Sequence, residues 1–116
     1  MRKVTNYDRA VQVWVLLSCA AHERTFYTYG GIARKLGIPQ ARQAIIAYLG
    51  PIMYYCQKHD LPPLTILVVN QETGQPGDGL SAVAHEDREK VRVQVFQHEW
   101  LKIPPPTAEE FKKAMP

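Results

Sequence analysis

The sequence predicts a small, mainly helical domain with a short β element, arranged as a winged helix-turn-helix. Three observations predict this class. Apolar residues recur at helical spacing through much of the chain. Two helical segments, residues 29–36 and 40–49, are joined by the tight corner Gly37-Ile38-Pro39. One β-branched run, residues 64–69, has the length and the bounds of a buried strand.

The first helix is expected at residues 8–22. Its apolar side chains at helical spacing form one stripe, Val11, Trp14, Val15 and Cys19. Other apolar residues widen this stripe, so we expect the helix to be buried on more than one side. The helix-turn-helix should pack against it through Trp14 and Ile32.

Capping residues define the two helices of the turn. Thr28 is a good N-cap for a helix at residues 29–36, and Gly37 suits the left-handed position that ends a helix. Pro39 cannot continue that helix, but it suits the first turn of the next one, which is predicted at residues 40–49.

The pattern continues less regularly beyond residue 49. Gly50-Pro51 interrupts the helical spacing, so we expect a separate helix at residues 52–59 before the strand. The glycine-rich residues 71–80 are expected to form a turn or a wing.

The C-terminal part is predicted to contain one more helix and a tail. Residues 85–100 fit either a helix or an alternating strand, and acidic residues ahead of Lys90 favour the helix. The domain is predicted to cover residues 1–103. A Pro-rich tail with a short capped turn follows at residues 104–116.

Composition excludes some classes and leaves others open. The net charge of +3 permits a polyanionic partner without requiring one. No apolar run approaches the roughly 20 residues of a membrane span, and residues 1–6 are not followed by the apolar region of a signal peptide. Cys19 and Cys56 lie in apolar helical segments, so we expect reduced thiols and a cytoplasmic protein.

One segment resembles a known family. Residues 28–42 read TYGGIARKLGIPQAR, and Val13-Trp14 lie in the preceding helix. This pattern resembles the helix-turn-helix in the C-terminal domain of O6-alkylguanine-DNA alkyltransferases and of their catalytically silent relatives, the alkyltransferase-like proteins. Residues 91–99, VRVQVFQHE, are similar to the last helix of that family. The resemblance implies an alkyltransferase-C-terminal-like winged helix-turn-helix that binds DNA.

The resemblance also implies roles for two residues. The tyrosine of the family's TYG motif, here Tyr29, presses on the DNA backbone beside an extruded nucleotide. The family's arginine, here Arg42, enters the base stack through the minor groove and fills the gap that the base leaves. Extruding a base costs about a few kcal/mol, and a side chain that holds the vacated space lowers this cost.

The residue types of the helix-turn-helix suit DNA contacts on chemical grounds. Arg34 and Lys35 can contact phosphates, whereas Gln40, Arg42 and Gln43 can contact a groove. The plain alternative for these side chains is an ordinary solvated helical face.

The family's reactive site is missing. In that family a PCHRV motif follows an apolar strand, but residues 67–72 here read LVVNQE, with Asn70 near the place of the cysteine. An amide cannot act as a thiolate nucleophile, so alkyl transfer is not expected. An insertion relative to the family, at about Met53 to Leu61, precedes this strand. The sequence therefore predicts a non-enzymatic DNA-repair-like protein whose partner is double-stranded DNA, plain, modified or distorted.

Two other functions remain open. The helix-turn-helix could dock a protein, in which case residues 40–46 would present an apolar, uncharged surface. A small enzyme or nucleotide-binding protein would instead use a pocket near Tyr54, Tyr55 and Asn70.

No metal or cofactor is expected. Cys56 and His59 share one helical face, but a zinc site needs more ligands than these two. The segment 71–79 contains neither a P-loop nor a dinucleotide-binding pattern. It is expected to form a turn, or a wing whose acidic residues, Glu72 and Asp78, would repel phosphate.

Overall fold

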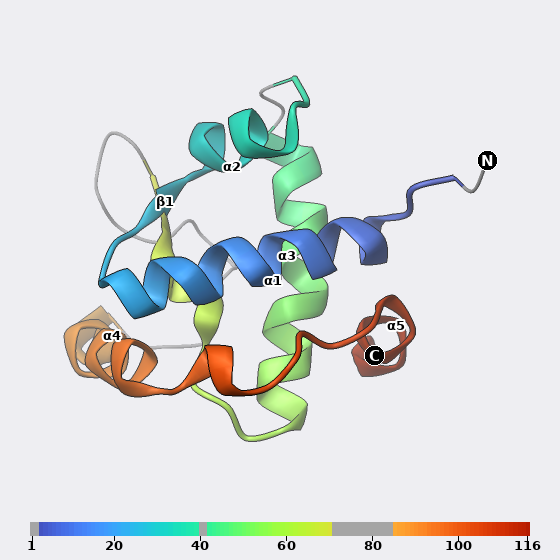
Figure 1. Ribbon diagram of the computed structural model, residues 1–116. Coiled ribbons are helices and arrows are strands. Elements are labelled where there is room, and N and C mark those ends of the chain that lie inside the picture. Colours follow the sequence, from blue (N-terminus) through green and yellow to red (C-terminus); the bar gives the residue numbers. More distant parts are fainter. Residues whose placement is uncertain (1–2, 40–41, 71–84) are drawn as a thin grey trace.

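The computed structural model describes residues 3–39, 42–70 and 85–116. Within these residues the chain is mainly helical, as predicted, with a short two-stranded sheet (Figure 1). The α-helices are α1 (Asn6–Glu23), α2 (Tyr29–Leu36), α3 (Arg42–Lys58), α4 (Arg88–Gln97) and α5 (Ala108–Ala114). The strands are β1 (Tyr27–Thr28) and β2 (Val68–Val69), and the 3-10 turns are η1 (Leu64–Leu67), η2 (His85–Asp87) and η3 (Trp100–Lys102).

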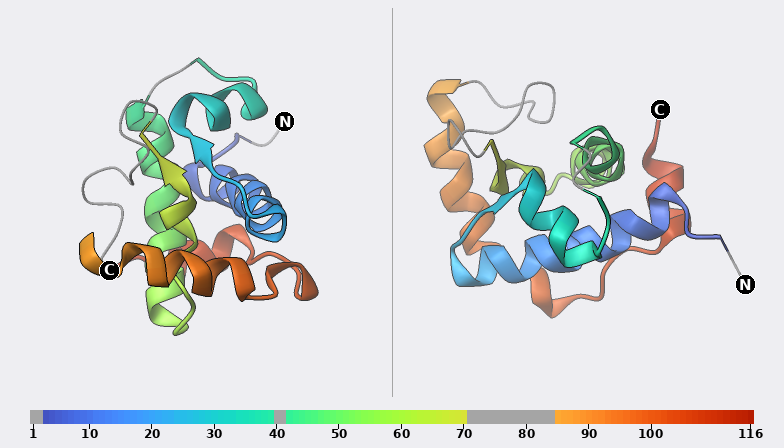
Figure 2. Two further views of the ribbon diagram at one scale, coloured as in Figure 1. Left: turned by 90° about the vertical axis from the view of Figure 1, so that its left-hand side faces the viewer. Right: turned by 90° about the horizontal axis from the view of Figure 1, so that it is seen from above.

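Helix α1 is the central element. It crosses in front of α3 in Figure 1, with α2 above it and α4 below its C-terminal half. Seen from above, in the right-hand view of Figure 2, α4 and α5 lie near opposite ends of α1. Helix α1 accordingly contacts each of the other four α-helices.

The first helix begins at Asn6, earlier than the predicted start at Asp8. A capping box explains the difference. The Asp8 N–H donates to Thr5 Oγ1 at 3.1 Å, and the Thr5 N–H donates to Asp8 Oδ2 at 2.8 Å. The aspartate is therefore the third residue of the helix, and Arg24, in a left-handed conformation, ends it.

The buried stripe of α1 differs from the predicted one. Buried apolar side chains recur at helical spacing, Ala10, Val13, Trp14, Leu17 and Ala21. Val15 is 42% exposed and Cys19 is also exposed, so their predicted place on the buried face was wrong. Apolar residues surround most of this helix, and their spacing alone did not distinguish the buried side.

Helix α2 has the predicted bounds and the predicted caps. The Gly31 N–H donates to Thr28 Oγ1 at 3.0 Å. Gly37 ends the helix at φ +69°, a left-handed conformation that glycine adopts without the strain of a side chain. Ile32 is fully buried on the inner face of α2.

The predicted break at Gly50-Pro51 was wrong, because one helix, α3, runs through it. The buried residues of α3 keep helical spacing across the proline, at Ile45, Leu49, Ile52 and Cys56. Pro51 removes one backbone hydrogen bond. Packing of this continuous stripe against α1, α5 and η1 outweighs that loss.

The predicted strand at residues 64–69 is confirmed only for Val68–Val69. Residues 64–67 form the 3-10 turn η1 instead, and all six side chains are buried. Strand β2 pairs in parallel with β1, with Tyr27 opposite Val68. Strand β1 stops at Thr28 because that residue caps α2. It therefore offers β2 only two residues to pair with.

A wing is not seen among the described residues, whose sheet is this parallel pair alone. The segment 71–80, predicted as a turn or wing, lies outside the described residues.

Residues 85–97 are helical, which confirms helix over strand, but α4 is shorter than predicted and ends at Gln97. Trp100 belongs instead to η3, where its indole Nε1–H donates to the Val95 carbonyl at 2.8 Å. This bond fixes the ring against the core.

Aromatic rings join the C-terminal residues to the core. The Trp14 ring lies 5.6 Å from Tyr55, 5.5 Å from Trp100 and 5.8 Å from Phe111, between centroids. Phe111 is fully buried on α5, which starts with a capping box. Residues 104–116, set apart in the sequence as a Pro-rich tail, thus contribute to the same core.

Candidate nucleic-acid interface

One part of the chain is basic without any compensating acidic residue. Between Glu23 and Asp60 the sequence contains five Arg or Lys residues and no Asp or Glu. This stretch forms β1, α2 and α3. The whole chain has a net charge of +3, so the rest of the chain is net negative. Three of these cations, Arg34, Lys35 and Arg42, lie on α2 and at the start of α3, whereas Arg24 ends α1 and Lys58 lies in the last turn of α3.

Helix α2 presents two cations in its last turn. Arg34 and Lys35 are both exposed. They line a surface hollow of about 490 Å³ together with Gly31 and residues 26–28. A side chain on Gly31 would crowd this hollow, because its Cβ would lie 3.1 Å from Thr28 Oγ1.

A second hollow flanks the other side of α2. Lys35 and Leu36 line it with Arg9, Gln12 and Leu16 of α1, and its volume is about 260 Å³. The Arg9 guanidinium donates to Gln12 Oε1 at 3.0 Å, which holds it at this site. Arg9 thus extends the basic surface of α2 onto α1. The sequence did not indicate Arg9, because its place beside α2 depends on the tertiary fold.

Arg42 is held over the ring of Tyr29. Its Cζ lies 5.1 Å from the ring centroid, which is the geometry of a cation–π contact. Tyr29 is only 9% exposed, whereas Arg42 is exposed. The tyrosine therefore serves as a platform that positions the guanidinium at the start of α3.

The position of Arg42 strengthens the local positive potential. The first turn of a helix has unpaired N–H groups and carries a partial positive charge. A cation there is unfavourable to the helix, and an anion bound beside it is favoured. Gln43, the next residue, is exposed and adds an amide to this end of α3.

The structure thus locates five of the six predicted contact residues. Arg34 and Lys35 lie in the last turn of α2, and Tyr29, Arg42 and Gln43 gather where the N-terminal ends of α2 and α3 approach one another. The sixth, Gln40, lies outside the described residues.

The alternative pocket near Tyr54, Tyr55 and Asn70 adjoins residues outside the described ones and stays a prediction. The Tyr55 ring packs on Phe111 at 5.5 Å and on His59 at 4.1 Å, toward α5. Burial, with a smaller effect of the nearby Glu110 carboxylate, raises the pKa of Tyr55. Asn70 follows β2, which lies on the far side of α3 from α5 in Figure 1.

The two cysteines are free thiols in different surroundings. Cys19 is exposed on α1, whereas Cys56 is 1% exposed on α3. Burial raises the pKa of Cys56 to about 11, so its thiol stays protonated at neutral pH. The described residues contain no group of three His, Cys, Asp or Glu side chains that could hold a metal ion. Among the helices described, none is long and apolar enough to cross a membrane.

Comparison of the chain with protein-family models, curated proteins and solved structures gives no match.

Proposed function

We propose that this protein binds double-stranded DNA without altering it chemically, using α2 and α3 as a helix-turn-helix. The observation that carries the proposal is the exposure of Arg34, Lys35 and Arg42 on a stretch of chain without acidic residues. Cationic side chains that neutralise phosphates supply most of the sequence-independent affinity of DNA-binding proteins. The TYGGIARKLGIPQAR motif supports the same function through its resemblance to the alkyltransferase family.

The surface at the start of α3 favours DNA over a protein partner. A protein-docking helix-turn-helix would present apolar side chains there. Arg42 and Gln43 are exposed instead, while Ile45 is fully buried and Ile46 only half-buried. A cationic and polar helix end suits a groove lined by phosphates.

The contact between Arg42 and Tyr29 supports a base-extruding mode. The Tyr29 ring holds the guanidinium at the exposed start of α3, which is where a side chain that enters a base stack would have to lie. Asn70 near the place of the family's cysteine, together with the buried Cys56, supports binding without alkyl transfer.

A salt titration tests this proposal. Fluorescence anisotropy would compare a plain duplex, an O6-methylguanine duplex and a single strand across a series of salt concentrations. We expect duplex binding whose logarithm falls linearly with the logarithm of salt concentration. The double variant Arg34→Ala/Lys35→Ala should reduce the slope by about two units, about one for each phosphate contact.

The matched control removes the same charge elsewhere. Lys112→Ala/Lys113→Ala changes two exposed lysines on α5, remote from α2 (Figure 1). It should leave the slope close to that of the wild type. Equal losses in both double variants, or no duplex binding at low salt, would contradict the proposal.

A further inference from the structure

Two arginines and two phenylalanines contact one another in the order Arg–Phe–Phe–Arg, between α4 and the loop that joins α1 to β1. The Arg24 Cζ lies 5.8 Å from the centroid of Phe96, and the Phe96 ring lies 5.7 Å from Phe26 at an interplanar angle of 68°. The Cζ of Arg92, which belongs to α4, lies 5.4 Å from the centroid of Phe26. We call this set Arg24, Phe96, Phe26 and Arg92 the Arg–Phe ladder.

The ladder has exposed aromatic surface flanked by positive charge. Phe26 is 44% exposed, and Arg24 is exposed. Arg92 is largely covered, and it also pairs with Glu89 at 3.3 Å. An exposed aromatic ring near an exposed guanidinium group suits unpaired bases, because every base has a π-face and every phosphate a negative charge.

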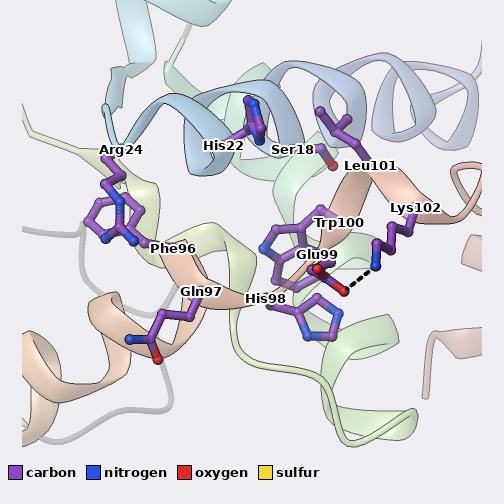
Figure 3. Close-up of a pocket in the computed structure, with 10 residues that line it drawn as sticks. All are labelled: Ser18, His22, Arg24, Phe96, Gln97, His98, Glu99, Trp100, Leu101 and Lys102. Atoms are coloured by element: carbon purple, nitrogen blue, oxygen red, sulfur yellow. Dashed lines mark ion pairs between the residues drawn. The ribbon is translucent and has the colours of Figure 1, made fainter.

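The ladder connects two hollows. Phe26 lines the hollow beside Arg34 and Lys35 on α2. Arg24 and Phe96 line another pocket, of about 500 Å³, between α1, α4 and η3, drawn in Figure 3. We call the second hollow the α1–α4 pocket. The surface proposed to bind duplex DNA thus continues across the ladder into this pocket.

The α1–α4 pocket has aromatic and polar walls. The rings of His98 and Trp100 lie 4.3 Å apart on one side, and α1 supplies Ser18 and His22 on the other (Figure 3). The acidic residue of the pocket, Glu99, pairs with Lys102 at 3.0 Å, so its charge is compensated.

The buried hydroxyl of Ser18 also indicates that the pocket receives a ligand. Ser18 is 2% exposed, and its hydroxyl has no hydrogen-bond partner among the described residues. Buried hydroxyls in proteins are nearly always bonded, because leaving one unpaired is unfavourable. A polar atom of a base in the pocket would supply this missing bond.

We propose that the Arg–Phe ladder and the α1–α4 pocket bind unpaired nucleotides that continue from a duplex held on α2 and α3. A base stacks on the exposed Phe26 ring, and Arg24, which lies beside Phe96, faces the phosphate that follows it. One base reaches the pocket beside Trp100 and bonds to the Ser18 hydroxyl. This inference rests on the proposed duplex-binding function and adds the kind of DNA preferred, a junction between a duplex and a single strand.

The test compares three DNA ligands at one salt concentration. They are a blunt duplex, the same duplex with a short single-stranded tail on either strand, and the duplex with an abasic tail of equal length. The natural tail should tighten binding about tenfold on one strand, the size expected for stacking of a base on aromatic residues. The abasic tail keeps the phosphates and should lose most of this gain.

Two variants locate the effect. Phe96→Leu and Ser18→Ala should each reduce the gain from the natural tail while leaving blunt-duplex affinity unchanged. Cys19→Ala, an exposed neighbour on α1 that does not line the pocket, is the matched control and should keep the whole gain. Melting temperatures verify that each variant is folded.

The outcomes separate this inference from the function on which it rests. Equal affinity for tailed and blunt duplexes, or a gain that survives both Phe96→Leu and Ser18→Ala, would overturn the inference alone. A gain that is the same for natural and abasic tails would also overturn it, because phosphates rather than bases would then be bound. Failure to bind the blunt duplex would instead overturn the proposed function.

Discussion

Replacing Arg42 by alanine separates two ways in which this residue could serve DNA binding. In the free protein its guanidinium rests on the Tyr29 ring at 5.1 Å, at the first residue of α3. Alanine removes one positive charge, one cation–π contact and one side chain long enough to reach into a base stack. These three losses affect different measured quantities: the salt dependence of binding, the free energy of unfolding and the affinity for DNA.

The magnitudes follow from the geometry. An exposed cation–π contact stabilises by about 0.5–1 kcal/mol, so the free energy of unfolding should fall by no more than about this amount. Loss of a phosphate contact lowers the salt slope by about one unit. If Arg42 also fills the gap left by an extruded base, its loss should cost about 2 kcal/mol more, or roughly thirtyfold in affinity.

The assay combines salt-titrated anisotropy with a duplex that carries 2-aminopurine, whose fluorescence rises when the base leaves the stack. Arg42→Lys keeps the charge without the planar guanidinium, so it should retain the slope and lose most of the fluorescence change. Lys35→Ala should reduce the slope for every sequence alike, and Tyr29→Phe should lie between Lys35→Ala and Arg42→Ala. The base-extruding mode is refuted if Arg42→Ala binds as tightly as the wild type with an unchanged fluorescence signal.

Four further predictions concern stability and thiol chemistry. Phe111→Ala should lower the free energy of unfolding by about 3–5 kcal/mol, because the ring is fully buried among aromatic partners, whereas exposed Lys112→Ala should change it by less than about 0.5 kcal/mol in a denaturant titration. Gly37→Ala should cost about 1–2 kcal/mol from its positive φ alone, since a Cβ there meets no atom within 4 Å; an unchanged melting temperature would contradict this. Iodoacetamide at neutral pH should label Cys19 but not Cys56, whose thiol is buried and has a pKa of about 11. Mass spectrometry should find no methyl adduct on either cysteine after incubation with an O6-methylguanine duplex, and such an adduct would show that our motif alignment is wrong.

Local signals predicted the helices well where caps specify their ends. Thr28 and Gly37 gave both ends of α2, because a hydroxyl that accepts an N–H and a glycine with positive φ act within a few residues. The helical type of α4 was predictable from acidic residues near its start, and the turn at Thr107 from its capping box.

Tertiary contacts decided what the sequence could not. Gly50-Pro51 reads as a break, yet the buried stripe of α3 continues through it because the helix packs on α1, α5 and η1. The run at residues 64–69 reads as a strand, but its partner β1 has only two residues, so most of the run forms a turn. A short run of buried apolar residues has the same sequence pattern whether it forms a strand or a helical turn.

The candidate interface was partly readable from the sequence. The motif indicated the residues on α2 and at the start of α3. The absence of acidic residues between Glu23 and Asp60 is a second feature of the sequence that indicates a basic surface. Arg9 and the Arg–Phe ladder had no such signal. Their positions depend on how α1, α4 and the loop before β1 fold against one another.

Chemical-shift mapping tests the central claim most directly. A blunt duplex would be titrated into isotope-labelled protein while the backbone amide resonances are followed by NMR. We predict that the largest shifts fall on α2 and the first turn of α3, at Gly31, Arg34, Lys35, Arg42 and Gln43, and that α5 remains unaffected. Shifts concentrated on α5 and η3, or no shifts at low salt, would contradict the claim that this basic surface binds DNA.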